Sequence, residues 1–179
     1  AWFLLHCWSV GLGGHFTALS CRGTDLSRDE DKMFQLHPQL EADTLLLGVF
    51  PLSVLLLSKD ANYPWCILVP QREGPSGDEV REIYQLNEAD RQQLLHESCL
   101  LAETLSNLFA ADKINVATIG NKVPQLHMHH VARFESDAAW PGPVWGAVAA
   151  AAYPQQLLTE TAERIVAALT PLGLLAKRA

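Results

Sequence analysis

Basic side chains and long apolar runs are both scarce in this sequence. Its 179 residues include 13 Lys and Arg against 20 Asp and Glu, which gives a formal net charge of −7 at pH 7. Duplex nucleic acid is bound mainly by Lys and Arg side chains that neutralise phosphates, so we expect no nucleic acid partner. No run approaches the roughly 20 apolar residues that a membrane-spanning helix needs, so we expect a soluble protein without a membrane partner. A small phosphorylated ligand is compatible with this composition, because one pocket can be rich in hydrogen-bond donors on an acidic protein.

Cysteine is also sparse and irregularly placed. The four cysteines contain no C-x-x-C pair and stand at Cys7, Cys21, Cys66 and Cys99. This spacing is unlike that of a zinc ribbon, and the number is too low for a disulfide scaffold. We therefore expect free thiols in a reducing, cytoplasmic compartment, and no bound metal.

The first 32 residues differ from the rest of the chain. Residues 1–14 are apolar, aromatic and rich in glycine, whereas residues 21–32 are charged. A secretory signal needs a basic segment before its apolar stretch, and the sequence has none there. We interpret residues 1–32 as an appendage or a translation-start artefact that packs poorly. A regular pattern starts at Met33, so residues 33–179 are expected to form a single domain.

From residue 44 onward the sequence carries strand and helix signals in turn. Short apolar runs bounded by turn residues predict strands, and longer stretches with apolar residues on one face predict helices. The expected strands are 44–50, 54–58, 65–69, 114–118 and 124–134. The expected helices are one from the N-cap Asn87 to about Ala110 and one over 153–169, with a loop over 71–82. This order predicts an α+β fold: an antiparallel sheet of about five strands, a long helix after the meander and a C-terminal helix.

The segment 125–131, with the sequence QLHMHHV, concentrates polar rings on one short stretch of chain. Side chains alternate along a strand, so Gln125, His127 and His129 are expected on one face and the apolar residues between them on the other. Two imidazoles and an amide therefore converge on one site.

Three interpretations of this arrangement stay open. The histidines could be satisfied by hydrogen bonds and serve structure alone, as a single His usually does. They could instead offer two imidazole ligands to zinc, which needs a third and usually a fourth ligand. The remaining candidate ligands show no suitable spacing: His37, His96, His130, Cys66 and Cys99. The third interpretation is covalent catalysis at phosphorus.

Covalent catalysis at phosphorus suits a pair of imidazoles. A neutral imidazole, with a reference pKa of about 6.5, is nucleophilic at neutral pH and can take a nucleotidyl group from a phosphoanhydride or a phosphoramidate. The group then passes to water or to another acceptor. A second imidazole on the same face can hydrogen-bond the phosphate or protonate the leaving group, while amide and backbone N–H groups hold the phosphoryl charge. This chemistry requires no metal and no other cofactor, so we expect none.

The histidine segment resembles the signature of the histidine triad (HIT) family, in which histidines alternate with apolar residues on a strand of an α+β fold. In the family an Asn on a neighbouring strand and a polar turn precede the signature, as Asn115 and Asn121-Lys122 do here. Ile67-Leu68-Val69-Pro70 and Trp140-Pro141 are similar to further family elements, and the resemblance covers about residues 44–145.

Three positions depart from the family pattern. Gln125 stands in place of the first histidine, and glutamine can replace one imidazole hydrogen bond but cannot carry a titratable proton. Asn121-Lys122 replaces the more usual Gln-Ser or Gln-Thr. His130 stands where the family has an apolar residue; we interpret it as structural, facing either the core or solvent.

The resemblance implies roles for individual residues. His127 matches the family's nucleophile and His129 matches the histidine near the phosphate, with Gln125 completing the catalytic group. Asn115 and Asn121 match residues that contact ribose and phosphate.

The resemblance also implies a function. It predicts a hydrolase or nucleotidyl transferase acting on nucleoside mono- or polyphosphates, with a purine base favoured, and a homodimer. Asp60 and Asn62 precede Trp65 in a turn, about where family members bind the ribose hydroxyls, although turns are also the ordinary home of Asp and Asn. The alternative is a nucleotide-binding module with little or no turnover. The tryptophans Trp65, Trp140 and Trp145 are interpreted as core or interface aromatics.

Overall fold

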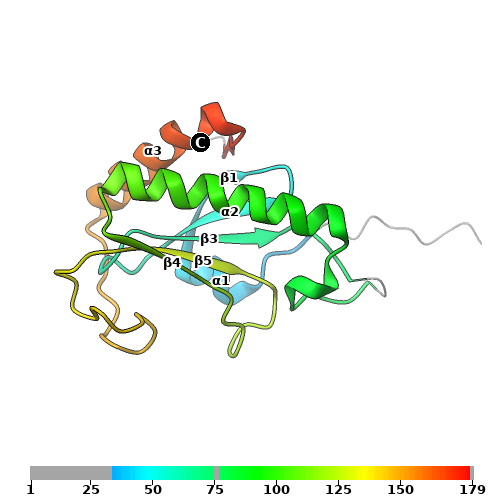
Figure 1. Cartoon of the computed structure of the whole chain (residues 1–179), viewed down its shortest axis with the longest axis horizontal. Coiled ribbons are helices and arrows are strands. Elements are labelled where there is room, and N and C mark those ends of the chain that lie inside the picture. Colours follow the sequence, from blue (N-terminus) through cyan, green and yellow to red (C-terminus); the bar gives the residue numbers. More distant parts are fainter. Residues whose placement is uncertain (1–33, 75–76, 178–179) are drawn as a thin grey trace, which may run out of the picture. The chain divides into compact units, whose positions relative to one another are not determined.

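The first element of the described residues is a short helix, α1 (Pro38–Asp43), in a computed structural model that describes residues 34–74 and 77–177 (Figure 1). His37 caps this helix, because its Nδ1 accepts a hydrogen bond from the Gln39 N–H at 3.1 Å. Pro38 suits the first helical position, where its missing N–H leaves no bond unmade. The predicted appendage over residues 1–32 lies outside the described residues and stays a prediction.

Six strands form one sheet in the order β4-β5-β3-β2-β1-β6, and all of its pairs are antiparallel. Their bounds are β1 (Thr44–Val49), β2 (Ser53–Ser58), β3 (Trp65–Pro70), β4 (Lys113–Ala117), β5 (Met128–Arg133) and β6 (Leu175–Ala176). The predicted antiparallel sheet and the α+β class are confirmed. Strands β1 to β3 form the expected meander.

Two long helices follow the pattern that the sequence predicts. Helix α2 (Glu88–Phe109) begins after Asn87, whose side chain accepts the Asp90 N–H at 2.9 Å, so the predicted N-cap is confirmed. It ends at Ala110, which has a left-handed φ of 51°. Helix α3 (Gln155–Leu169) closes the fold, and single 3-10 turns lie at η1 (Ile83–Gln85) and η2 (Thr170–Leu172). None of the helices in residues 34–74 and 77–177 has both the length and the apolar character needed to cross a bilayer.

Helices α2 and α3 pack on one face of the sheet, and α1 packs on the other (Figure 1). The strand residues alternate accordingly. Cys66, Leu68 and Met128 join the core beneath the long helices, whereas Ile67 and Val69 join the cluster on the α1 face. The sheet therefore has a helical face and an α1 face.

The sixth strand was not predicted, because it is only two residues long and depends on a distant glycine. Gly48 in β1 pairs with Ala176, and a Cβ at residue 48 would collide with the carbonyl oxygen of Leu175. Only a residue without a side chain lets β6 approach this closely. A local pattern in the last residues cannot show that such a partner exists.

The strand that carries the histidines is shorter than predicted. It spans Met128–Arg133 instead of 124–134, and the residues before Met128 leave the ladder. The Leu126 N–H donates to the carbonyl of Val80 at 2.7 Å, so this stretch is held by the loop before η1 instead of by a neighbouring strand. Leu126 still packs in the helical-face core, as the predicted alternation requires.

His130 faces the helical core and is fully buried, which decides between the core and solvent alternatives. Its Nδ1 lies 3.2 Å from the Met128 carbonyl, which can only accept, so Nδ1 carries the proton. Its Nε2 therefore accepts from the Ser98 hydroxyl on α2, at 2.7 Å. Burial lowers the pKa of His130 to about 4, although the bond to the Met128 carbonyl opposes this shift.

This burial makes stability depend on pH. His130 has a folded pKa of about 4 and an ordinary value of 6.5, so the unfolded chain binds its proton first. The contribution of neutral His130 to the free energy of unfolding is fully present above pH 6.5 and is lost as the pH drops toward 4. The difference in pKa is worth about 3 kcal/mol, at about 1.4 kcal/mol per pKa unit. Urea unfolding at pH 7 and at pH 4.5 should show most of this loss.

The double variant Ser98→Ala/His130→Leu is the matched control, because it removes both polar partners and leaves neither buried alone. Its free energy of unfolding should fall less between the two pH values than that of the unmodified protein. Equal losses in the two proteins would contradict the assignment.

Candidate functional site

His127 and His129 lie together on the α1 face of the sheet, as predicted. Their ring centroids are 4.8 Å apart and the rings meet edge to face at 83°. Their exposed fractions are 5% and 7%, so both imidazoles are largely shielded from water. Ile67 pairs directly with His129 and places it on this face.

The hydrogen bond of His127 determines which ring nitrogen is basic. Its Nδ1 lies 2.6 Å from the backbone carbonyl oxygen of Gln125, which can only accept a hydrogen bond. Nδ1 therefore carries a proton, and in the neutral imidazole Nε2 is the nitrogen with the free lone pair. A neutral imidazole in this tautomer presents Nε2 as the nucleophilic atom.

His129 has the opposite tautomer to His127. The indole Nε1–H of Trp65 donates to its Nδ1 at 3.0 Å, so Nε2 carries the proton. Burial, followed by the neighbouring His127 and His130, lowers the pKa of His129 to about 3. His129 is therefore neutral near pH 7 and offers an Nε2–H as a hydrogen-bond donor.

Both polar atoms of the Gln125 side chain form hydrogen bonds with the segment before α1. Its Oε1 accepts the His37 N–H at 2.9 Å, and its Nε2 donates to the Gln35 carbonyl at 2.9 Å. The backbone of Gln125 orients His127 while its amide fastens residues 35–37 beside the histidines. Sequence reasoning assigned the glutamine to the catalytic group but could not show this contact.

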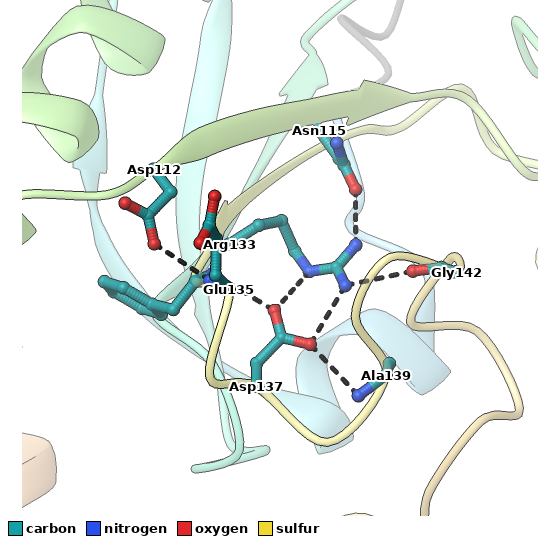
Figure 2. A network of polar contacts seen from close by, with 8 residues as sticks. Asp112, Asn115, Arg133, Glu135, Asp137, Ala139 and Gly142 are labelled. Atoms are coloured by element: carbon teal, nitrogen blue, oxygen red, sulfur yellow. Dashed lines mark hydrogen bonds and ion pairs between the residues drawn. The ribbon is translucent and has the colours of Figure 1, made fainter.

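Beyond the histidines, a buried charge network occupies the same face of β5. Arg133 and Asp137 pair through two hydrogen bonds of 2.7 and 3.0 Å, and their side chains are only 2% and 5% exposed (Figure 2). Hydrogen bonds from Arg133 lower the pKa of Asp137 to about 2, and the N–H groups of Phe134 and Ala139 act in the same direction. The Arg133 guanidinium also donates to the Gly142 carbonyl at 2.9 Å.

Asn115 belongs to this network. It pairs with Val131, which places it on the α1 face, and its Oδ1 accepts from Arg133 at 2.6 Å (Figure 2). The bond to Arg133 uses the side-chain oxygen and orients the amide nitrogen. Asn115 therefore lies on the strand next to the histidines and on their face of the sheet, held by a partner that sequence reasoning did not identify.

The network anchors the loop that follows β5. Arg133 donates hydrogen bonds to the Asp137 carboxylate and the Gly142 carbonyl, and Trp145, three residues further along the loop, packs beside His129. The Trp145 ring lies 5.6 Å from that of His129 and 5.8 Å from that of Trp65, edge to face in both cases. These aromatic rings help to exclude water from His129.

Asp60 and Asn62 bind the far end of this loop. Asp60 accepts the N–H groups of Asn62 and Ala151 at 3.0 and 3.1 Å, and the Asn62 amide donates to the Ala149 carbonyl at 2.9 Å. No hydrogen bond within residues 34–74 and 77–177 joins this pair to the histidines. The structure shows them as loop anchors, and their predicted contact with ribose stays a prediction.

Asn121 lies apart from the histidine pair, in the connection between β4 and β5. It lines an open cleft of about 510 Å³. The other lining residues are Arg81, Glu82, Thr118, Ile119, Gly120 and Pro124. The same connection leads directly into Gln125 and His127.

Sequence reasoning missed two residues of the site, Trp65 and Arg133. Trp65 starts a predicted strand and Arg133 lies next to the end of another, so each looks like an ordinary boundary residue. Only the register of β3 and β4 against β5 brings them to the α1 face. No group of three His, Cys, Asp or Glu side chains in the described part of the chain is arranged to hold a metal ion.

The Arg133–Asp137 pair yields a stability prediction. Asp137→Ala leaves a buried guanidinium without its carboxylate, which should cost about 3 to 5 kcal/mol of unfolding free energy in a urea titration. Glu88→Ala is the matched control, because it breaks a 2.8 Å pair with Arg91 on the exposed side of α2. The control should change stability far less. Similar losses in both variants would contradict a special role for the buried pair.

A family comparison covers the elements just described. The model of the HIT domain family matches residues 39–136, which include the sheet from β1 to β5 and helix α2. No match to a curated protein was found.

Solved structures of three bacterial histidine triad proteins are similar to this chain. The protein of Marinobacter aquaeolei VT8 is 45% identical, with a TM-score of 0.73 over 79% of this chain and 99% of that one. The Bradyrhizobium japonicum protein is 41% identical, with a TM-score of 0.70 over 74% and 96%. The Sinorhizobium meliloti 1021 protein is 39% identical, with a TM-score of 0.71 over 76% and 97%. Because the family model spans more than half of the chain and these relatives match over nearly their whole length, the chain belongs to the histidine triad (HIT) domain family.

Proposed function

We propose that this protein is a nucleotidyl hydrolase or transferase that cleaves phosphoanhydride or phosphoramidate bonds of nucleoside phosphates through a nucleotidyl-His127 intermediate. The observation that carries the proposal is the 2.6 Å bond from His127 Nδ1 to the Gln125 carbonyl. In the neutral imidazole this bond places the free lone pair on Nε2, and it fixes the ring plane. The nucleotide-binding character of the HIT family supports the choice of substrate.

The proposed first step is a displacement at phosphorus. The lone pair of His127 Nε2 forms a bond to the α-phosphorus, and the bond from phosphorus to the leaving group breaks with its electron pair. The imidazole ring becomes positively charged because Nδ1 keeps its proton, and the Gln125 carbonyl stabilises that charge. Water or another acceptor then attacks phosphorus, gives up a proton and releases neutral His127.

His129 assists as a neutral donor in this proposal. Its Nε2–H lies on the ring next to His127 and can hydrogen-bond a phosphoryl oxygen. Its low pKa means that it donates without bearing a positive charge, so the leaving group takes its proton from elsewhere. Gln125, in place of the first triad histidine, acts by holding residues 35–37 and the carbonyl that orients His127.

Further residues are proposed to bind the rest of the substrate. Asn115 would use its amide nitrogen, since Arg133 already binds its oxygen, and Asn121 would act from the cleft of about 510 Å³. Asp60 and Asn62 are proposed to reach the ribose hydroxyls by exchanging their loop contacts, as the family resemblance implies. A purine nucleotide is the favoured ligand on the same ground.

His127→Ala should abolish turnover of a fluorogenic adenosine phosphoramidate or a dinucleoside polyphosphate. The expected loss of kcat is about three orders of magnitude or more, because the nucleophile is removed. His96→Ala is the matched control, since His96 is an exposed histidine on α2, away from the site. A chelator should leave the activity of the unmodified protein unchanged. Turnover that survives in the His127 variant would contradict the mechanism.

The intermediate itself can be trapped. Rapid acid-free quenching during turnover, followed by peptide mass spectrometry, should locate the nucleotidyl group on His127. A nucleotidyl group on any other residue would overturn the assignment. A missing adduct together with measurable turnover would point to direct attack by water.

The second candidate function is a nucleotide-binding module with little turnover. The observations that favour it are the exposed fractions of only 5% and 7% for His127 and His129, and the occupied amide of Gln125. Tight binding of a purine nucleotide by calorimetry, with no product formed, would support the module over the enzyme.

We also propose that the protein forms a homodimer, as the resemblance implies. Strand β4 is an edge of the sheet, and Val116 on it is 47% exposed. An open edge of this kind can pair with a second copy. Light scattering should give twice the chain mass, and Val116→Lys should shift the protein toward monomer. A monomer at all concentrations would contradict this.

A further inference from the structure

Trp65 occupies a position from which it can control His129. It is the first residue of β3 and pairs with Val131, so it lies beside His129 on the neighbouring strand and on the same face. Its indole donates to His129 Nδ1 at 3.0 Å, and the two rings meet edge to face with centroids 5.3 Å apart. Trp65 thus makes both a polar and a packing contact with this histidine.

We propose that Trp65 is the positioning residue of the site, which holds His129 as the neutral Nε2–H tautomer and so aims a fixed donor at the reacting phosphoryl group. An indole N–H can only donate, so its bond with Nδ1 exists only while Nδ1 has no proton. Both the Nδ1–H tautomer and the charged imidazolium break that bond. The indole therefore favours one protonation state out of three.

The groups around His129 reinforce this preference. Along the same segment it faces His127, which precedes β5, and His130 follows it; both disfavour a positive charge on it. The elements packed against it contribute Trp65 from β3 and Trp145 from the loop after β5, and neither side chain titrates. The tautomer assignment depends on these contacts alone, whereas the role at phosphorus rests on the proposed function.

Trp145 supplies a matched control. Its ring lies 5.6 Å from that of His129, close to the 5.3 Å of Trp65, but its Nε1 has no hydrogen-bond partner among the described residues. Replacing either tryptophan by Phe keeps an aromatic ring against His129. Only the change at Trp65 removes the donor to Nδ1.

The direct test is long-range ¹H–¹⁵N correlation of the imidazole rings in the ¹⁵N-labelled full chain at pH 7. The unmodified protein should show His129 with a protonated Nε2 and an unprotonated Nδ1. Trp65→Phe should give a mixture of tautomers and raise the pKa of His129, whereas Trp145→Phe should keep the Nε2–H form. A wild-type spectrum with protonated Nδ1, or a Trp65→Phe spectrum unchanged from wild type, would overturn the proposal. The wild-type spectrum decides the point even if a variant fails to fold.

Turnover measurements separate this inference from the proposed function. If the protein is an enzyme, Trp65→Phe should lower kcat about tenfold, the value of roughly one hydrogen bond, with little change in KM. The acidic limb of its pH profile should move to higher pH, because His129 then protonates more readily. An unchanged kcat in a variant whose tautomer has changed would reject the positioning role. If the unmodified protein shows no turnover, the proposed function fails while the spectra still test the tautomer.

Discussion

The register of β5 between β3 and β4 is the constraint on which the site depends. Pairing Ile67 with His129 on one side and Asn115 with Val131 on the other turns His129, Asn115 and Arg133 to the α1 face. The same pairing turns His130 toward α2. Because side chains alternate with a period of two, a slip by one residue would exchange the two faces. The core and the candidate site are therefore specified by the same set of strand contacts.

Three histidines within four residues have three different environments, and each environment sets which ring nitrogen donates or accepts a hydrogen bond. His127 meets a carbonyl that can only accept, and His129 meets an indole that can only donate. His130 meets a carbonyl and a hydroxyl together and serves the core. Identical side chains thus have three different sets of hydrogen-bond partners. The distinction arises from the neighbours, because a free imidazole has no strong preference among these states.

The polar groups of the α1 face are kept in a fixed geometry by a loop anchored at both ends. Arg133 holds its beginning through Asp137 and Gly142, and Asp60 and Asn62 hold its end. Between these anchors the loop presses Trp145 against His129. Burial is the largest cause of the lowered pKa of His129, and the Trp145 ring contributes to that burial. A buried ion pair thereby affects a titrating group with which it shares no direct contact.

The sequence by itself determined the α+β class, the meander, helix α2 with its Asn87 cap, and the common face of His127 and His129. Each follows from a period of two or 3.6 residues, or from a local capping bond, so nearby residues suffice to predict it. Tertiary structure alone decided the bond from Trp65 to His129 and the hydrogen bonds of the Gln125 side chain to residues 35–37. It also decided the hydrogen bond from Arg133 to Asn115 and the pairing of β6 with β1. The first two join residues 64 and 88 positions apart, and such contacts depend on strand register and chain path. Local periodicity carries no information on either, which is why the histidine pair could be predicted from the sequence and its hydrogen-bond partners could not.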